Sequence, residues 1–190
     1  MRCYNGVVLP WVGQVFLMFL SVKELEIRKI RFDETFAPRQ IDFTGEDLVQ
    51  GTPLHATGTA ELLPESGGQL RVSGSYAVEM EAQCDRCLGR ARFPLEAVFD
   101  LYYQPASDSP SEDEVKIDEG EAEIGFYEDG LELEDVLREQ VMLALPMQRV
   151  CSESCKGICP TCGKSRNEAA CDCQPEAVAD RWSSLRDLKL

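Results

Sequence analysis

The chain has 190 residues, and its 19 Lys and Arg stand against 34 Asp and Glu, giving a formal net charge of −15 with the single histidine neutral. The charge is uneven: residues 96–139 hold two basic and sixteen acidic side chains, whereas residues 146–190 hold seven and six. A uniformly basic nucleic-acid binder is excluded, because phosphate neutralisation needs clustered Lys and Arg. We call residues 96–139 the acidic block. A basic surface formed by residues on either side of this block is not excluded.

Residues 1–17 contain an apolar stretch that is broken by Pro10, Gly13 and Gln14. The stretch falls short of the about 18 apolar residues that a membrane span needs, and it lacks the small-x-small cleavage site of a secretory signal. We favour a non-native extension that precedes a start at Met18 over a signal peptide. Either way, the chain is expected in a reducing cytoplasm and not in a membrane.

Alternation of apolar and polar residues predicts strands over residues 22–32, 54–63, 69–82 and 90–103. Short loops rich in Pro and Gly join the last three, which is typical of an antiparallel meander. Residues 104–123 are rich in carboxylates, Pro and Ser and poor in apolar side chains, so we expect a solvated loop there. The simplest interpretation of that acidic loop is an exposed connector whose charge aids solubility.

A short strand is expected at residues 124–127, followed by the main helix. Asp129-Gly130 opens this helix and Pro146 ends it, since proline cannot continue an α-helix. Its apolar residues recur at helical spacing and are expected to cover one face of the meander: Leu133, Val136, Leu137, Val141, Ala144 and Leu145. A short terminal helix is expected within residues 175–190.

These elements predict an α+β fold: an antiparallel β meander packed by one main helix, with a Cys-rich metal-binding C-terminal segment and a short terminal helix. We expect a core domain over residues 18–148, which includes the acidic loop 104–123, and a zinc-binding tail over residues 149–190. The tail is too poor in large apolar residues to form a core of its own.

Cysteine is the most unusual feature of the composition, with nine residues of which six lie within 151–173. The pair in Cys159-Pro160-Thr161-Cys162-Gly163 can grip one metal ion, and the following glycine suits the tight bend. Six candidate ligands compete for the four places of a closed, structural Zn²⁺ site: Cys151, Cys155, Cys159, Cys162, Cys171 and Cys173. The spacing of Cys155, Cys159 and Cys162 also matches a motif for an iron–sulfur cluster, which we disfavour because the segment lacks the surrounding barrel.

Cys84 and Cys87 lie in the loop between two predicted strands. Three interpretations compete: a pair that completes the C-terminal site or forms a second metal site, a redox dithiol, and two buried thiols. A redox dithiol is disfavoured, because a thioredoxin-like motif lies between a strand and a helix and this pair lies within a β meander.

Basic side chains flank both cysteine regions and are candidates for contact with RNA phosphates: Arg86, Arg90, Arg92, Lys156, Lys164 and Arg166. For the three arginines, an equally good explanation is that they are exposed strand residues paired with the acidic block. The sequence has no phosphate-binding loop, nucleophile elbow or histidine partner for His55, so we do not expect an enzyme.

The cysteine motifs, taken in order, resemble the YceD family of large ribosomal RNA subunit accumulation proteins. The resemblance spans about residues 18–190 and is carried by Cys84-Asp85-Arg86-Cys87-Leu88, the helix end Leu143-Ala144-Leu145-Pro146, the run Cys155-Lys156-Gly157-Ile158-Cys159-Pro160-Thr161-Cys162-Gly163, and Cys171-Asp172-Cys173 before Arg181-Trp182. Where similar sequences often have Asn-Leu-Asn after the turn, this chain has Ser165-Arg166-Asn167, which removes no candidate ligand.

The resemblance implies a bacterial cytoplasmic factor needed for the accumulation of large-subunit (23S) ribosomal RNA, and not an enzyme. Its expected partners are ribosomal RNA, large-subunit ribosomal proteins or assembly factors. A second hypothesis is a protein-interaction module whose acidic block binds a basic ribosomal protein. A third, less favoured, is a dithiol redox protein.

Overall fold

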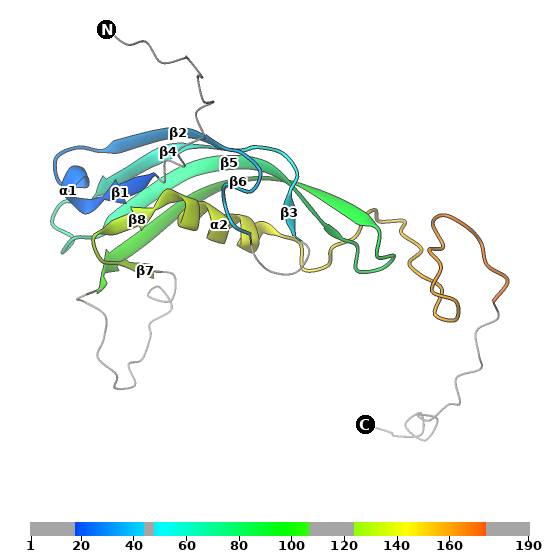
Figure 1. Ribbon diagram of the computed structural model, residues 1–190. Helices are drawn as coiled ribbons and strands as arrows, with labels where there is room; N and C mark the ends of the chain where they lie inside the picture. The colour runs from blue at the N-terminus through cyan, green and yellow to red at the C-terminus, as the bar shows by residue number, and fades with distance from the viewer. Residues whose placement is uncertain (1–17, 44–47, 107–123, 174–190) are drawn as a thin grey trace, which may run out of the picture. The chain divides into compact units, whose positions relative to one another are not determined.

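The computed structural model describes residues 18–43, 48–106 and 124–173, and the chain divides into two compact units (Figure 1). The first unit takes in residues up to Glu81 together with Phe93–Leu145, and the second takes in Ala82–Arg92 together with residues from Pro146 onward. The division groups the loop of Cys84 and Cys87 with the C-terminal segment. The predicted extension 1–17, most of the acidic loop and the terminal helix within 175–190 lie outside the described residues.

A six-stranded sheet organises the fold, with strand order β2-β4-β5-β6-β7 and β3 paired to β5. The strands are β2 (Ile30–Phe36), β3 (Val49–Gln50), β4 (Leu54–Leu62), β5 (Leu70–Gln83), β6 (Arg90–Pro105) and β7 (Ile124–Tyr127). β2 pairs antiparallel with β4, β4 pairs antiparallel with β5, and β7 pairs parallel with β6. The predicted α+β fold, with its meander over β4, β5 and β6, is therefore confirmed.

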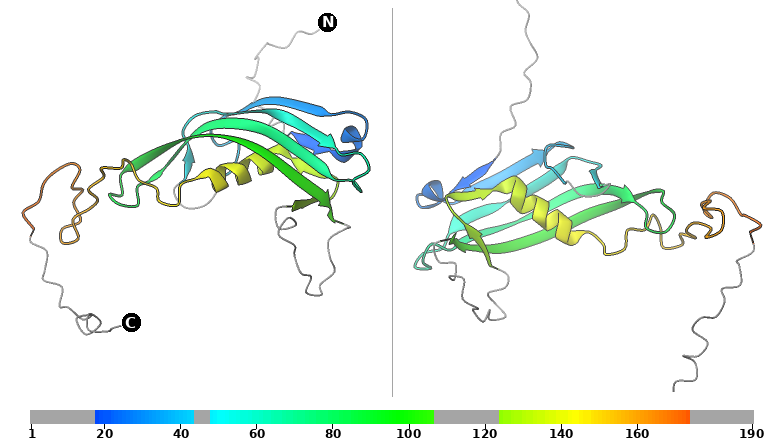
Figure 2. Two further views of the ribbon diagram at one scale, coloured as in Figure 1. Left: turned by 180° about the vertical axis from the view of Figure 1, so that it is seen from behind. Right: turned by 60° about the horizontal axis from the view of Figure 1, so that its bottom comes forward.

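Helix α2 (Leu133–Ala144) lies across one face of the sheet (Figure 2). Alternate strand residues bury their side chains on this inner face, because successive side chains of a strand point to opposite faces. The largest fully buried side chains of the first unit come from both layers: Leu20, Leu54, Leu70, Met80, Leu133 and Leu137. The Tyr76 hydroxyl also donates to the carbonyl oxygen of Gln140 at 2.9 Å, which ties the helix to β5.

Two short elements differ from the sequence prediction. The strand predicted over residues 22–32 is correct only for residues 30–32, where β2 starts. β1 (Phe19–Ser21) comes first, and α1 (Val22–Leu25) forms one helical turn before β2. The main helix begins at Leu133 and not at Gly130, because residues 130–132 form β8, which pairs antiparallel with β1. Backbone pairing with a segment distant in the sequence overrides the local helical signal there. The predicted apolar face also ends early, since Ala144 is exposed.

Neither helix among the described residues has the length and apolar content that crossing a bilayer requires.

Gly58 and Gly74 lie opposite each other on β4 and β5 and allow aromatic rings to cover the inner face closely. A Cβ atom on Gly74 would lie 2.4 Å from the Thr57 carbonyl oxygen and 3.1 Å from the ring of Phe99. A Cβ atom on Gly58 would lie 2.4 Å from the ring of Phe32, its partner on β2. The sheet therefore has no room for a side chain at this pair.

Replacing Gly74 with alanine is expected to lower the free energy of unfolding by about 1–3 kcal/mol, because the added methyl group meets backbone atoms that cannot move aside. Urea unfolding monitored by circular dichroism measures the change. Ser75→Ala, at the exposed neighbouring position, is the matched control and should change stability by less than about 0.5 kcal/mol. Equal stability of the Gly74 variant and the wild type would contradict the close approach.

Candidate metal centres

The second unit brings eight cysteines into two groups of four, and within each group all Sγ atoms lie within 4.8 Å of one another. We call Cys84, Cys87, Cys151 and Cys155 cluster A, and Cys159, Cys162, Cys171 and Cys173 cluster B. None of these eight thiols forms a disulfide. Four convergent thiols are the ligand set of a closed tetrahedral metal site.

Cluster A joins two segments that are far apart in the sequence. The first is the tight loop between β5 and β6, where the Cys84 N–H donates to the Gly89 carbonyl oxygen at 2.7 Å. The second follows the main helix and is fixed beside that loop by Asp85 and Arg149: the Asp85 N–H donates to the Arg149 carbonyl oxygen at 2.7 Å, and the Arg149 N–H donates to the Asp85 carboxylate at 2.6 Å. These paired bonds bring the two pairs of thiols together.

The spacing of the sulfur atoms in cluster A fits a tetrahedral ion. The Sγ atoms of Cys84 and Cys155 are 3.9 Å apart, and those of Cys87 and Cys151 are 3.7 Å apart. A tetrahedron with metal–sulfur bonds of about 2.3 Å has sulfur–sulfur edges of about 3.8 Å. A disulfide would need about 2.05 Å between its sulfur atoms. The residues of this cluster therefore fit a metal ion and not a covalent pair.

Cluster B is built locally, on a turn between Cys159 and Lys164. The Cys159 N–H donates to the Lys164 carbonyl oxygen at 2.8 Å, and the Gly163 N–H donates to the Cys159 carbonyl oxygen at 2.9 Å. Gly163 has φ of 71°, a left-handed conformation that glycine adopts without the steric cost of a side chain. This turn presents Cys159 and Cys162 toward Cys171 and Cys173.

Asn167 supports cluster A from outside the ligand set. Its side-chain nitrogen donates to the Cys155 sulfur at 3.3 Å, while its side-chain oxygen accepts a bond from the Lys156 N–H at 2.8 Å. Such outer partners orient metal ligands and tune their basicity. Sequence reasoning did not assign this role, although an asparagine shortly after a Cys-Pro-x-Cys-Gly turn is a signal that could be searched for.

Hydrogen bonds favour the thiolate form of one cysteine in each cluster. Burial acts to raise the pKa of Cys84, but the backbone N–H groups of Cys87, Cys151 and Arg86 lower it to about 6. Backbone N–H groups of Cys162 and Thr161 likewise lower the pKa of Cys159 to about 6.

The neighbouring thiols oppose further ionisation. Hydrogen bonding with Cys155 raises the pKa of Cys151 to about 12, and hydrogen bonding with Cys162 raises that of Cys173 to about 12. Like charges at this spacing disfavour one another. A divalent cation would remove the conflict and allow all four thiols of a cluster to ionise, so either cluster could hold a metal ion.

The six C-terminal cysteines thus do not form a single group of candidate ligands. Cys151 and Cys155 lie with the earlier pair, Cys84 and Cys87, whereas the other four lie together in cluster B. The sequence left this assignment open among six candidates. Four ligands for each of two sites accounts for every described cysteine, and Cys3 lies outside the described residues.

The basic residues that the sequence singled out all belong to the second unit and are exposed. Arg86 donates to the Gln148 side chain at 3.2 Å, while Arg90 and Arg92 have interactions of their own. Among the described residues, the side chains of Lys156, Lys164 and Arg166 have no ion pair. These three cations are therefore available to an external anion.

The net charge of the second unit depends on metal occupancy. Its described residues include seven Lys and Arg and four Asp and Glu. A divalent ion bound by four thiolates adds two negative charges, so two filled clusters would change the net charge of these residues from +3 to −1. Contact with phosphate would thus rest on individual exposed cations and not on a broad positive field.

The sequence of the chain is similar to those of several known proteins. The family model for the large ribosomal RNA subunit accumulation protein YceD matches residues 72–189. Uncharacterized protein Rv2926c of Mycobacterium tuberculosis is 28% identical over 161 residues, covering 82% of this chain and 72% of the relative. A maize protein named large ribosomal RNA subunit accumulation protein YCED homolog 1, chloroplastic, is 23% identical over 214 residues, covering 92% and 72%. No solved structure matches the chain.

We expect the purified protein to carry two metal ions per chain, one in each four-cysteine cluster. Cys87→Ser and Cys162→Ser should each lower the content to one ion, because serine is a poor replacement for a thiolate ligand. Inductively coupled plasma mass spectrometry with amino-acid analysis gives the ratio. Replacing the exposed Ser154 with alanine is the control and should leave two ions. A single ion in the wild type would contradict the two-cluster arrangement.

Removing metal with a chelator is expected to disorder the second unit while the sheet of the first unit stays folded. Thiolate ligation supplies order that apolar burial cannot supply in a segment with so few large apolar side chains. Hydrogen exchange read by mass spectrometry should show protection lost in residues 146–173 and kept in β4 and in α2. Loss of protection throughout the chain would refute the separation of the two units.

Proposed function

Because the chain belongs to the YceD family of large ribosomal RNA subunit accumulation proteins, we propose that it is a non-enzymatic ribosome biogenesis factor that supports accumulation of 23S ribosomal RNA in the cytoplasm. The observation that carries the proposal is the family match over residues 72–189, which includes cysteines of both clusters. Family membership implies the role in accumulation of large-subunit ribosomal RNA.

The proposed metal is Zn²⁺ in both clusters. All-cysteine tetrahedral coordination is typical of structural zinc, and the sulfur–sulfur distances of 3.9 Å and 3.7 Å in cluster A match its bond length. The ion would supply a redox-inert cross-link between chain segments. A closed site with four protein ligands leaves no coordination position for a substrate, so a structural role is favoured over a catalytic one. An iron–sulfur cluster would colour the protein, whereas zinc is colourless.

The proposed RNA contact uses the exposed cations beside the clusters. Lys156 and Lys164 flank the turn that begins cluster B, and Arg166 is held by a bond from its N–H to the Gly157 carbonyl oxygen at 2.9 Å. If both clusters hold metal, they would order the backbone that carries these three side chains and so keep the cations in a fixed array. Such an array can contact several phosphates at once, which gives affinity but little sequence specificity.

Deleting the gene in its own organism is expected to lower the ratio of large-subunit to small-subunit ribosomal RNA. Complementation with the wild type should restore the ratio, whereas the double variant Lys164→Glu/Arg166→Glu should restore it only in part. The same variant should weaken binding of a 23S fragment by about tenfold and reduce the slope of log affinity against log salt by about 2. Filter binding at several salt concentrations measures both.

The matched control is Lys23→Glu/Arg31→Glu, which reverses two exposed charges on the first unit. It changes the net charge equally and should bind and complement like the wild type. An unchanged ribosomal RNA ratio after deletion would overturn the proposed function. Equal loss of RNA binding in both double variants would instead overturn only the contact through the second unit.

A further inference from the structure

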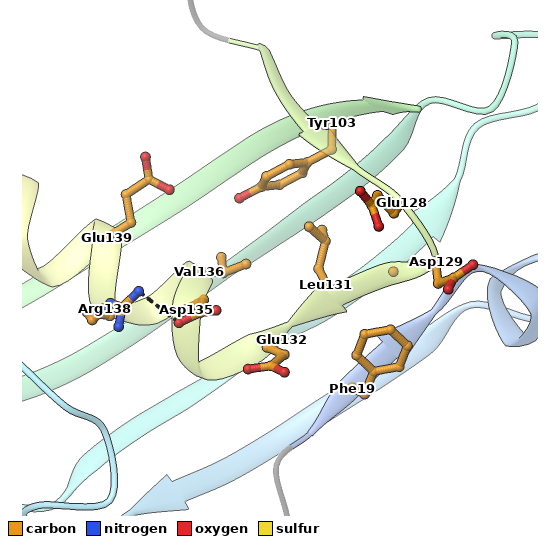
Figure 3. A pocket seen from close by; sticks show the side chains of 11 residues that line it. Phe19, Tyr103, Glu128, Asp129, Leu131, Glu132, Asp135, Val136, Arg138 and Glu139 are labelled. Carbon is orange, nitrogen blue, oxygen red and sulfur yellow. Dashed lines mark ion pairs between the residues drawn. The ribbon is translucent and has the colours of Figure 1, made fainter. Parts of the chain in front are cut away.

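The first unit contains an open cavity of about 690 Å³ that belongs to neither cysteine cluster. Its walls come from β1, β6, β8, the residues before β8, and the first turns of α2, as Figure 3 shows. The apolar part of its lining is formed by Phe19, Leu131 and Val136. A volume of this size lies within the about 300–1,000 Å³ that ligand sites usually have.

Five carboxylates and one guanidinium line the same cavity. The carboxylates belong to Glu128, Asp129, Glu132, Asp135 and Glu139. Arg138 pairs with Asp135 at 2.9 Å. Among the residues that the structure describes, the other four carboxylates have no ion pair.

The helix dipole explains only part of this acidity. Glu132 and Asp135 lie at the N-terminus of α2, where negative charge is favourable. Glu128 and Asp129 precede β8, and Glu139 lies beyond the first turn of the helix. None of these three carboxylates is therefore stabilised by the dipole at the start of the helix. These three carboxylates line the cavity and have no ion pair with any other residue that the structure describes.

Tyr103 is the second and independent sign of a ligand. Its side chain is only 9% exposed and lines the cavity, and Figure 3 shows the ring with its hydroxyl turned to the side where Glu139 lies. Among the described residues the hydroxyl has no hydrogen-bond partner, so at the wall of the cavity it is free to donate to or accept from a ligand. Burial and the charge of Glu139 raise the pKa of Tyr103 to about 12, so the hydroxyl stays protonated at neutral pH.

We propose that this cavity is a docking site for an arginine-bearing cationic segment of a partner protein. One guanidinium would stack on the ring of Tyr103 and donate to Glu139, and a second basic side chain of the segment would donate to Glu128. The aliphatic parts of these side chains would cover Leu131 and Phe19. The unpartnered Tyr103 hydroxyl accepts one further N–H of the guanidinium. This site does not depend on the metal clusters or on the role in ribosomal RNA accumulation.

The chemistry of the lining favours arginine over other ligands. A planar guanidinium stacks on aromatic rings and donates through a fork that matches carboxylates, whereas the compact ammonium of lysine does neither as well. A bare divalent ion needs only a small oxygen cage and gains nothing from Phe19, Leu131 and Val136. The excess of carboxylates repels the phosphates of RNA.

The test uses the full chain with both metal sites filled and a fluorescein-labelled peptide of alternating Arg and Gly. Fluorescence anisotropy at about 0.1 M salt should show binding that is weakened by about tenfold in Glu128→Gln/Glu139→Gln, since two charge contacts are lost. Tyr103→Phe, which keeps the ring, should weaken binding by about threefold. Arg138→Gln should tighten it by about twofold, because it removes the residue that competes for Asp135.

Two matched controls separate the site from general electrostatics. Glu34→Gln/Glu96→Gln removes two exposed carboxylates of the first unit outside the cavity, and Arg28→Gln removes an exposed cation. Both should bind the peptide within about twofold of the wild type. Thermal unfolding of each variant checks that the fold is kept.

Several outcomes would overturn the proposal. Equal weakening in Glu128→Gln/Glu139→Gln and in its control would mean that the peptide senses only net charge. A Lys–Gly peptide that binds as tightly as the Arg–Gly peptide would remove arginine as the occupant. Binding of Mg²⁺ or of a labelled uridine oligonucleotide in the absence of peptide, if it is lost in Glu128→Gln/Glu139→Gln, would assign the cavity to a cation or to RNA. Because none of these measurements involves ribosomal RNA accumulation, their failure would leave the proposed function untouched.

Discussion

The convergence of thiols from two distant segments is the constraint on which the second unit depends. Cys87 and Cys151 are separated by 64 positions in the chain, yet their sulfur atoms lie 3.7 Å apart. The segment that follows the main helix has few large apolar side chains, so hydrophobic burial cannot hold it in one conformation. Ligation of a metal ion would supply that order, and backbone bonds such as that from the Ile158 N–H to the Arg86 carbonyl oxygen, at 2.9 Å, add to it.

The first unit rests on a different physical principle. One face of its sheet is covered by α2, and the close pair of Gly58 and Gly74 lets aromatic rings pack against the backbone there. Its stability comes from apolar burial, which needs no metal ion. The two units therefore differ in what orders them, and this difference allows their contributions to function to be tested separately.

Charge divides the chain in the same way. Within the part of the chain that the structure describes, exposed cations without ion pairs, such as Lys164 and Arg166, occur beside the cysteine clusters of the second unit, whereas carboxylates without ion pairs line the cavity of the first. An anionic ligand and a cationic ligand would thus be recognised by different parts of one chain.

The sequence by itself determined the strands of the meander, the main helix and the chemistry of the cysteines, because period-two and helical patterns and the Cys-x-x-Cys turns are local. It did not determine how eight cysteines divide between two clusters, since the spacing of Cys151 and Cys155 suits either set. Only the tertiary structure placed them beside Cys84 and Cys87, through backbone pairing around Asp85 and Arg149. It also decided that residues 130–132 pair with β1 and that Tyr103 faces a cavity, because both depend on contacts between segments far apart in the chain.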